Sequence, residues 1–301
     1  MKPSNINRDF LDAIIAGRSV DAYYHLGLSS DDDVVAAIGD LTAVVMAGSG
    51  ERIRSFAETW SRLNGAAPVL AVRKEDRFVT RYCAGVLFVS HGMGMASASI
   101  ALQETMRLAY FVHGGDLDAL DAMFWCRVGT SGGIGVEPGT VVVSTEAVMA
   151  DLRPFRVLRG ADGEHVFESG FPAATVDALA SHRSDDFTIA TGRTACTNEF
   201  FLEQYRLDGA IRLDDEAGKQ ARLQWLAAND VVNIEMEGAL FAAYLNHWGF
   251  SEFAMVCVTL LDRLRGDQVT AAPEVLSRFA ERAGEVVFSH LSGRSHPRGT
   301  R

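Results

Sequence analysis

An arginine within an apolar run is the clearest chemical signal in the sequence. Arg127 lies among Phe124, Trp125 and Val128, and Thr130 and several glycines follow it directly. A buried guanidinium without a partner is costly. Arg127 therefore either forms a structural ion pair with an acidic side chain or, together with Thr130, holds an anion over the glycines. Arginine suits the second task because its fork matches phosphate oxygens.

Segment 48–52, with the sequence Gly-Ser-Gly-Glu-Arg, is a second candidate for anion binding. It follows an apolar strand-like run and opens an amphipathic helical pattern, an arrangement that turns free backbone N–H groups and the positive helix end toward an anion. Arg52 in the first turn adds a guanidinium. The alternative is an ordinary strand-to-helix turn, which also uses glycine.

Two carboxylates stand at the end of another strand-like run. Glu235 and Glu237 flank Met236 immediately before a helical pattern that begins at Ala239. Capping of that helix accounts for one of the two acids. The carboxyl end of a strand is also where α/β sheets usually bind ligands, and a carboxylate there can grip a sugar diol.

Two further motifs match known patterns incompletely. Segment 129–133 fits G-x-S-x-G, but a nucleophile elbow needs a helix after the serine, and a strand-like run follows here. Segment 91–97 is similar to a dinucleotide loop, but it lacks the third glycine and the acidic residue expected further on. We set both aside.

The elements that must position these residues form an alternating series. Short β-branched runs alternate with helical patterns, which predicts an α/β domain around one large sheet. Amphipathic or Ala/Leu-rich patterns predict covering helices near 53–63, 97–111, 239–248 and 275–287. We expect strands at 42–47, 69–73, 79–83, 86–90, 124–129, 140–145, 188–192, 231–235 and 254–260. With no internal repeat or linker, we expect a single domain at 23–291, an N-terminal extension at 1–22 and a flexible tail at 292–301.

Composition excludes several classes of protein. The 301 residues are 48% hydrophobic and can bury a large core, and the net charge of -11 disfavours nucleic acid and anionic membranes as partners. The four cysteines lack metal-binding or C-x-x-C spacing, so we expect reduced thiols, three of them in apolar strands. Because no apolar run resembles a secretory leader or spans a bilayer, we expect a cytoplasmic protein.

Five motifs together resemble one family. The chain is similar to the uridine phosphorylases of the nucleoside phosphorylase family, in particular the dimeric forms of animals, from about residue 23 to residue 291. The motifs are SHGMG at 90–94, RVGTSGGIGVEPGTVVV at 127–143, the C-T-x-x-F-x-x-x-Q-x-R-L-D-G-A run at 196–210, NIEMEG at 233–238 and CVTLLDRLRGDQV at 257–269.

The resemblance implies a fold and a set of site residues. The fold would be a single-domain three-layer sandwich with a mixed central sheet. The phosphate site would comprise Gly48, Arg52, Arg127 and Thr130, with Arg77 from a neighbouring subunit. Gln204 and Arg206 would bind the base, with Phe200 stacked on it. Met236 and Glu237 would hold the ribose, and His25 would reach its 5'-hydroxyl across a dimer interface.

The implied activity is phosphorolysis of uridine to uracil and ribose 1-phosphate by a homodimer with shared active sites. Gln204, Arg206 and Glu237 would be the catalytic residues, positioning the substrate and stabilising charge. Inorganic phosphate would be a co-substrate, and no metal or organic cofactor is expected.

One departure leaves the base preference open. Asp262 stands where pyrimidine-specific relatives usually carry asparagine and where purine-cleaving relatives often carry aspartate. The alternative that Asp262 raises is a purine or broad-specificity nucleoside phosphorylase of the same fold. Two further alternatives, independent of Asp262, are a nucleosidase of the same fold that uses water and a nucleoside-binding paralogue without catalysis.

Overall fold

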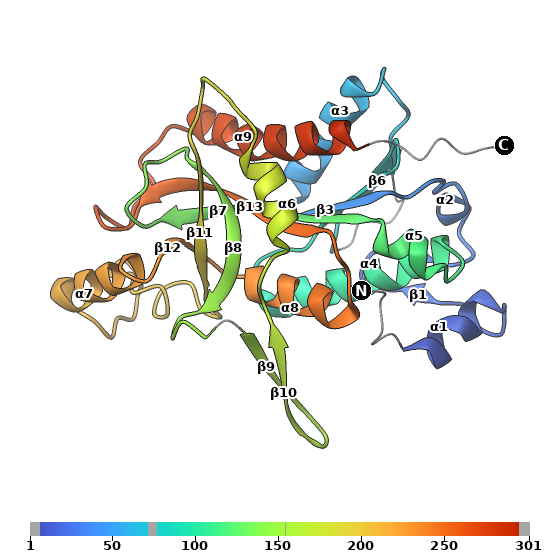
Figure 1. Cartoon of the computed structure of the whole chain (residues 1–301), viewed down its shortest axis with the longest axis horizontal. Coiled ribbons are helices and arrows are strands. Elements are labelled where there is room, and N and C mark those ends of the chain that lie inside the picture. The colour runs from blue at the N-terminus through green and yellow to red at the C-terminus, as the bar shows by residue number, and fades with distance from the viewer. Residues whose placement is uncertain (1–6, 72–76, 154, 295–301) are drawn as a thin grey trace.

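The computed structural model of the chain describes residues 7–71, 77–153 and 155–294, and a mixed sheet runs through its centre (Figure 1). Among these residues the sheet has nine strands. Their spatial order is β12 (Val231–Glu235), β11 (Ile189–Cys196), β8 (Val141–Met149), β13 (Phe253–Asp262), β7 (Phe124–Gly133), β3 (Ala43–Ala47), β6 (Val86–Ser90), β5 (Thr80–Cys83) and β4 (Leu70–Ala71).

The direction of the strands gathers the chemically interesting segments at one edge. β6, β3, β7 and β13 are mutually parallel neighbours, so their carboxyl ends lie together. The sheet also curls, because β12 at its far end pairs antiparallel with the end of β7, where Asn233 lies opposite Gly133. This second pairing brings the two glutamates that follow Asn233 toward the strand that carries Arg127.

Helices cover both faces of the sheet (Figure 1). One layer contains α3 (Gly50–Leu63), α6 (Ala173–Ala180) and α9 (Pro273–Gly293), and the other contains α4 (Met95–Val112) and α8 (Gly238–Trp248). Smaller elements are β1 (Ala22–Tyr23), β2 (Leu28–Ser29), α2 (Asp33–Ala36), α5 (Leu117–Asp121) and α7 (Glu216–Ala227). β9 (Phe155–Gly160) and β10 (Gly163–Glu168) form a hairpin that projects from the body of the molecule. The predicted three-layer sandwich with a mixed sheet is confirmed.

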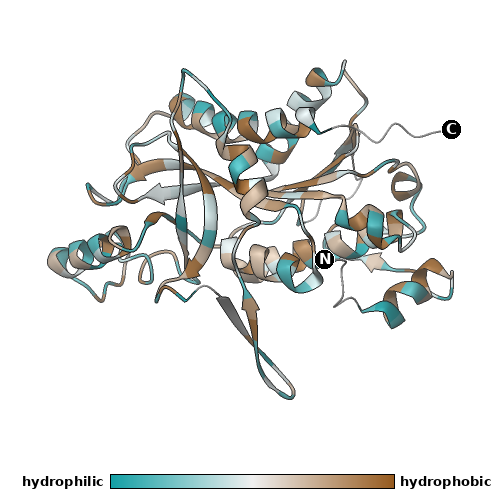
Figure 2. Ribbon diagram, in the orientation of Figure 1, coloured by the Kyte–Doolittle hydropathy of each residue, from teal (hydrophilic) through white to brown (hydrophobic). Residues whose placement is uncertain are grey.

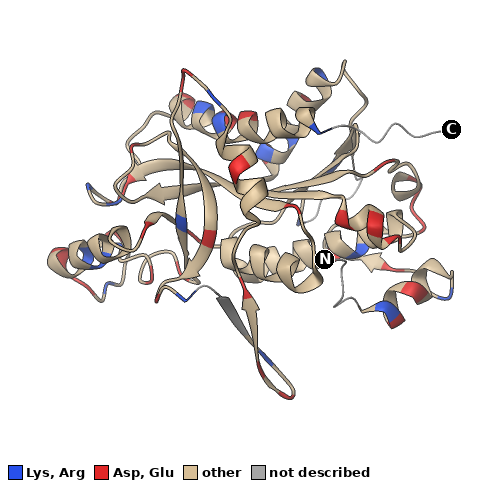
Figure 3. Ribbon diagram, viewed as in Figure 1, with Lys and Arg blue, Asp and Glu red and all other residues tan. Residues whose placement is uncertain are grey.

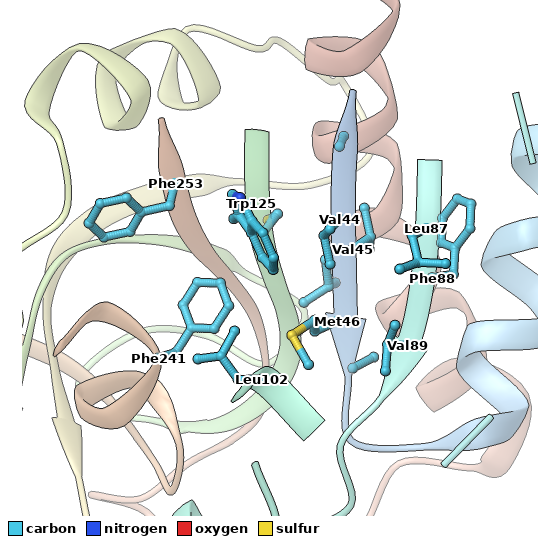
Figure 4. Close-up of a cluster of buried hydrophobic side chains, with 14 of the residues drawn as sticks. Val44, Val45, Met46, Leu87, Phe88, Val89, Leu102, Trp125, Phe241 and Phe253 are labelled. Atoms are coloured by element: carbon cyan, nitrogen blue, oxygen red, sulfur yellow. The ribbon is translucent and has the colours of Figure 1, made fainter. Parts of the chain in front are cut away.

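The hydrophobic core lies on the central strands. Every residue of β3 and β6 is buried, and Figure 4 shows side chains such as Met46, Trp125 and Phe241 packed between sheet and helices. The central strands are largely hydrophobic in Figure 2, and Figure 3 places most charged residues on the outer helices and loops. A charge within β7 is therefore an exception that needs its own explanation.

The predicted strands are present, and several are longer than expected. β7 continues through the glycines to Gly133, because its end finds a second partner in β12. The strand predicted at 69–73 is described as far as Ala71, and its last two positions lie outside the described residues.

The two ends of the chain fall partly within the described residues. Residues 8–15 of the predicted N-terminal extension form α1 (Arg8–Ile15), which packs on α4 through the buried Leu11 and Ile14. The helix is amphipathic but only eight residues long, so its pattern was not separated from the polar extension around it. Of the predicted tail, α9 extends to Gly293, and positions 295–301 lie outside the described residues.

Two smaller expectations concern the thiols and the membrane. All four cysteines are free and buried, as the sequence predicted. Among the helices described, none combines the length and apolar character needed to cross a membrane.

Candidate active site

A cavity of about 190 Å³ opens at the carboxyl edge of the parallel strands. Nine of the eleven site residues expected from sequence line it together: Gly48, Arg52, Arg127, Thr130, Phe200, Gln204, Arg206, Met236 and Glu237. They come from four separate segments of the chain. The parallel strands and the β12–β7 pairing are what bring those segments to one place.

One end of the cavity is built for an anion. Gly48 follows β3, Ser49 caps α3 by accepting a hydrogen bond from the backbone N–H of Arg52, and the amino end of α3 faces the cavity. Helix amino termini favour negative charge. Burial, together with the neighbouring Arg127, lowers the pKa of the Arg52 guanidinium. A bound anion would relieve the repulsion between the two arginines.

Arg127 has the ion pair that its position in the strand required. Its side chain is 4% exposed, and its Nη2 lies 2.9 Å from Glu235 Oε2 and also contacts Glu237 Oε2. The structural ion pair and the anion site were posed as alternatives, but the geometry combines them. Arg127 is paired and also lines the cavity.

The two glutamates differ in their surroundings. Glu235 turns inward and accepts hydrogen bonds from the backbone N–H groups of Glu237 and Gly238, which anchors the start of α8. Burial raises the pKa of Glu235 despite Arg127. For Glu237, burial is outweighed by the charge of Arg127 and by the N–H of Gly94, and its pKa is lowered. Glu237 is thus the glutamate held ready as an anion at the cavity.

The positive charge of Arg127 is stabilised by these two glutamates. Burial alone would lower its pKa, but Glu235 and Glu237 together raise it well above the ordinary value. The cluster is therefore a cation between two carboxylates. Both glutamates line the cavity, and Glu237 is the one whose pKa is lowered.

The other end of the cavity offers hydrogen bonds suited to a planar polar ring. The carboxamide of Gln204 is buried; its Nε2 donates to Thr197 Oγ1 at 3.1 Å, and its Oε1 accepts from Arg263 at 3.4 Å. The guanidinium of Arg206 lies 4.5 Å from the ring centroid of Phe200, which is 42% exposed. Arg206 is held there by Asp208 and by the carbonyl of Asp267.

Sequence reasoning missed a buried support for this end. Arg263, 1% exposed, lines the cavity, donates to the backbone carbonyl of Gln204 at 2.7 Å and pairs with Asp267. Asp267 also binds Lys219 of α7 at 3.0 Å. The available signal was a set of charged residues in the motif at 257–269, but which of them turned inward could not be read without the fold.

Three residues singled out from sequence lie elsewhere. His25 donates or accepts through Nδ1 at 2.7 Å from Glu104 Oε1, and the backbone N–H groups of His25 and Leu26 bind the other oxygen of Glu104. Arg77 is exposed. Neither lines the cavity of its own chain. Asp262 also does not line it, because its carboxylate binds the N–H groups of Gly135 and Leu264 and the side chain of Arg265.

His91 is a buried histidine beside the anion end, in the loop that sequence reasoning set aside. Its neighbours Gly92 and Met93 line the cavity. Burial, followed by the charge of Arg127, lowers the pKa of His91 to about 4. The ring is therefore neutral at ordinary pH.

This neutral histidine predicts an acid-dependent loss of stability. The unfolded chain binds a proton with the ordinary pKa near 6.5, whereas folded His91 resists it, so the contribution is present above that value and is lost as pH falls toward 4. Between about pH 7 and about pH 5, we expect wild type to lose about 2 kcal/mol more unfolding free energy than a His91→Gln variant. Urea unfolding at both pH values measures the difference. Equal losses of unfolding free energy in the two proteins would show that folded His91 takes up a proton as readily as unfolded His91 does.

Among the described residues, no group of three or more His, Cys, Asp or Glu side chains is arranged to hold a metal ion. The fold and the cavity instead define a class. A three-layer sandwich whose mixed sheet places two arginines, a pair of glutamates and a Gln-Arg pair around one cavity is the arrangement that the resemblance to the nucleoside phosphorylase family predicted.

Comparison with known proteins places the chain more closely. It belongs to the phosphorylase superfamily, whose family model matches residues 42–292. It is 37% identical to the uridine and thymidine phosphorylase of Caenorhabditis elegans over 273 residues, which cover 90% of each chain. It is 31% identical to the inactive uridine phosphorylase B of Schistosoma mansoni over 277 residues, which cover 90% of this chain and 91% of that protein.

A solved structure agrees with the sequence relatives. The crystal structure of uridine phosphorylase from Schistosoma mansoni in complex with uracil superposes with a TM-score of 0.85 at 31% identity, covering 95% of this chain and 98% of that chain. The family resemblance expected from the five motifs is confirmed.

Proposed function

We propose that the protein is a pentosyltransferase that catalyses phosphorolysis of uridine to uracil and ribose 1-phosphate. The observation that carries this proposal is the division of one cavity into an anion end, a central carboxylate and a base end. Relatives named uridine phosphorylases over nine-tenths of the chain support the same reaction.

The geometry suggests how the reaction proceeds. Phosphate sits between the Gly48 loop, Arg52 and Arg127, and one of its oxygens attacks C1' of the ribose. The C1'–N1 bond breaks, and uracil leaves with the electron pair as an anion that then takes up a proton. The protein contributes mainly by positioning the reactants and stabilising this charge.

Each subsite has a separate task in that step. Glu237, kept anionic, accepts hydrogen bonds from the ribose hydroxyls. Gln204 offers an acceptor for N3–H and a donor for O2 of uracil, and Arg206 donates toward O4, where negative charge develops. Thr130 adds a hydroxyl beside the phosphate. Met236 and Phe200 give apolar contact to sugar and base.

The test is turnover of uridine with and without inorganic phosphate. We expect uracil release that depends on phosphate and yields ribose 1-phosphate. Turnover that persists unchanged without phosphate would identify a nucleosidase. Binding of uridine with no uracil release would identify a non-catalytic paralogue, an outcome that matters because one relative is named inactive. The retained Arg52 and Arg127 favour the phosphorylase.

We also propose a homodimer with shared active sites. Arg77 and His25 lie outside the cavity of their own chain. Glu104 holds His25 by two hydrogen bonds and the N–H of Leu26 by a third, and the His25 ring stays 30% exposed. In this arrangement Arg77 of each subunit contacts the phosphate in the active site of the other subunit, and His25 contacts the ribose 5'-hydroxyl there.

Hybrid dimers test the shared site. Arg77→Ala and Arg127→Met variants will each be weak alone, but mixing them will restore one complete site in each hybrid. Because half of randomly mixed dimers are hybrids with one intact site, we expect about a quarter of wild-type activity. The measurement is uridine turnover after the two variants are refolded together. Activity no higher than the average of the parents would contradict the exchange of Arg77.

The remaining expectations concern chemistry and location. We propose that the reaction uses no metal or organic cofactor, so dialysis against a chelator should leave turnover unchanged. We also propose a cytoplasmic location, which the four free buried thiols support.

A further inference from the structure

A row of residues across three strands underlies the anion end; Gly48, Arg127 and Gly129 of this row line the cavity itself, and His91 is buried beside Gly48. Met46 of β3 lies opposite Val89 of β6 and opposite Arg127 of β7. Side chains alternate along a strand, so the residues two positions further on share the same face. Those residues are His91, Gly48 and Gly129, and the N–H of His91 continues the ladder by donating to Ala47 at 2.9 Å.

The two glycines leave a hollow in this row. A Cβ at Gly129 would lie 2.7 Å from Arg127 Nη1, which shows that the guanidinium folds over Gly129. A Cβ at Gly48 would lie 3.8 Å from Cε1 of His91. Because Cε1 stands between the two ring nitrogens, the nitrogen-bearing edge of the imidazole faces Gly48. Arg127 and His91 therefore flank the hollow from opposite sides.

His91 is buried without satisfying its own polar atoms. It is 2% exposed, and neither ring nitrogen makes a hydrogen bond of good geometry among the described residues, the backbone of Gly92 being its nearest polar partner. Native proteins rarely bury such atoms unpaired, and each case calls for an explanation. An apolar ring would fill the same volume without this cost. The nearby charged groups are Arg52, Arg127 and Glu237, all of which line the cavity.

We propose that His91 is a further phosphate-binding residue, whose neutral ring donates an N–H to the phosphate oxygen on the Gly48 side, opposite Arg127. This role rests on the proposed function, in which phosphate is the co-substrate. Two arginines already supply positive charge at this end, and a third buried cation beside them would be costly. A neutral donor adds a directed hydrogen bond without that cost.

The test measures binding of inorganic phosphate to the full-length protein by calorimetry, without nucleoside. His91→Phe keeps the ring shape and removes the donor, and we expect a rise in phosphate Kd of about tenfold or more. His91→Gln keeps a neutral N–H, and we expect it to stay within about threefold of wild type. The matched control is His290→Phe. His290 also has a buried, unpartnered Nε2, but it packs against Phe124 outside the cavity, and this variant should bind phosphate as wild type does.

Several results would overturn the role. Unchanged phosphate binding by folded His91→Phe would do so, as would a His91→Gln variant as weak as His91→Phe. If His91→Phe does not fold, NMR of the wild type provides the test. The imidazole resonance of His91, assigned by comparison with His91→Gln, must shift when phosphate is added, and a resonance that does not shift refutes the contact. Wild type that binds no phosphate would overturn the proposed function together with this role, whereas the other results bear on His91 alone.

Discussion

Replacing Arg127 with methionine will lower kcat/KM for uridine by about a thousandfold or more, because one side chain serves both the phosphate and the carboxylate that holds the ribose. The same change leaves Glu235 and Glu237 buried without a cation. Removing one partner of a buried ion pair costs about 3 to 5 kcal/mol of stability. Steady-state kinetics and urea unfolding of the same variant measure the two effects.

A second substitution separates the structural effect from the catalytic one. In Arg127→Met combined with Glu235→Gln, one uncompensated charge is gone, while the amide oxygen still accepts from the backbone of Glu237 and Gly238. We expect part of the stability to return and none of the activity. Recovery of activity along with stability would mean that Arg127 acts only as a structural ion-pair partner. That result would remove it from the phosphate site.

This cluster also illustrates what sequence can establish. An arginine between Trp125 and Val128 indicated a buried charge, and the two glutamates at the end of β12 indicated a site at a strand end. Their meeting depends on a pairing between β12 and β7 that joins residues about a hundred positions apart. Local patterns carry no information on such long-range pairing, so sequence left the ion pair and the anion site as alternatives.

The residues that sequence missed share a physical cause. Arg263 has several polar neighbours in the chain and His91 follows an apolar strand, but in both cases burial, which gives the residue its importance, is set by elements distant in the chain. Arg263 is enclosed by the loop that carries Gln204 and by Lys219 of α7, through Asp267. The helix α7 itself went unpredicted because few of its residues are buried, namely Lys219, Leu223 and Leu226.

The base preference of the site depends on whether the side chains of Asp262 and Arg206 reach the cavity. Asp262 raised the prospect of a purine substrate, but its carboxylate is occupied by two backbone N–H groups and by Arg265, away from the cavity. Arg206, in contrast, lines the cavity beside Phe200 and Gln204. Its donors match O4 of uracil. The amino group of cytosine would face them as a second donor and leave one unpaired, which costs about 1 to 3 kcal/mol.

We therefore expect uridine to be the best substrate, deoxyuridine and thymidine weaker because Glu237 loses the 2'-hydroxyl, and cytidine and inosine negligible. Arg206→Leu will lower kcat for uridine by about a hundredfold to a thousandfold, since it removes a donor aimed at the charge that develops on the leaving base. Asp262→Asn will change uridine turnover by less than about twofold, because asparagine can still accept from the two backbone N–H groups. Turnover of each nucleoside at fixed phosphate provides the comparison. The contrary result is that inosine is the best substrate and that Asp262→Asn loses inosine turnover while keeping uridine turnover. Asp262 would then have to leave its backbone partners during catalysis and contact the base.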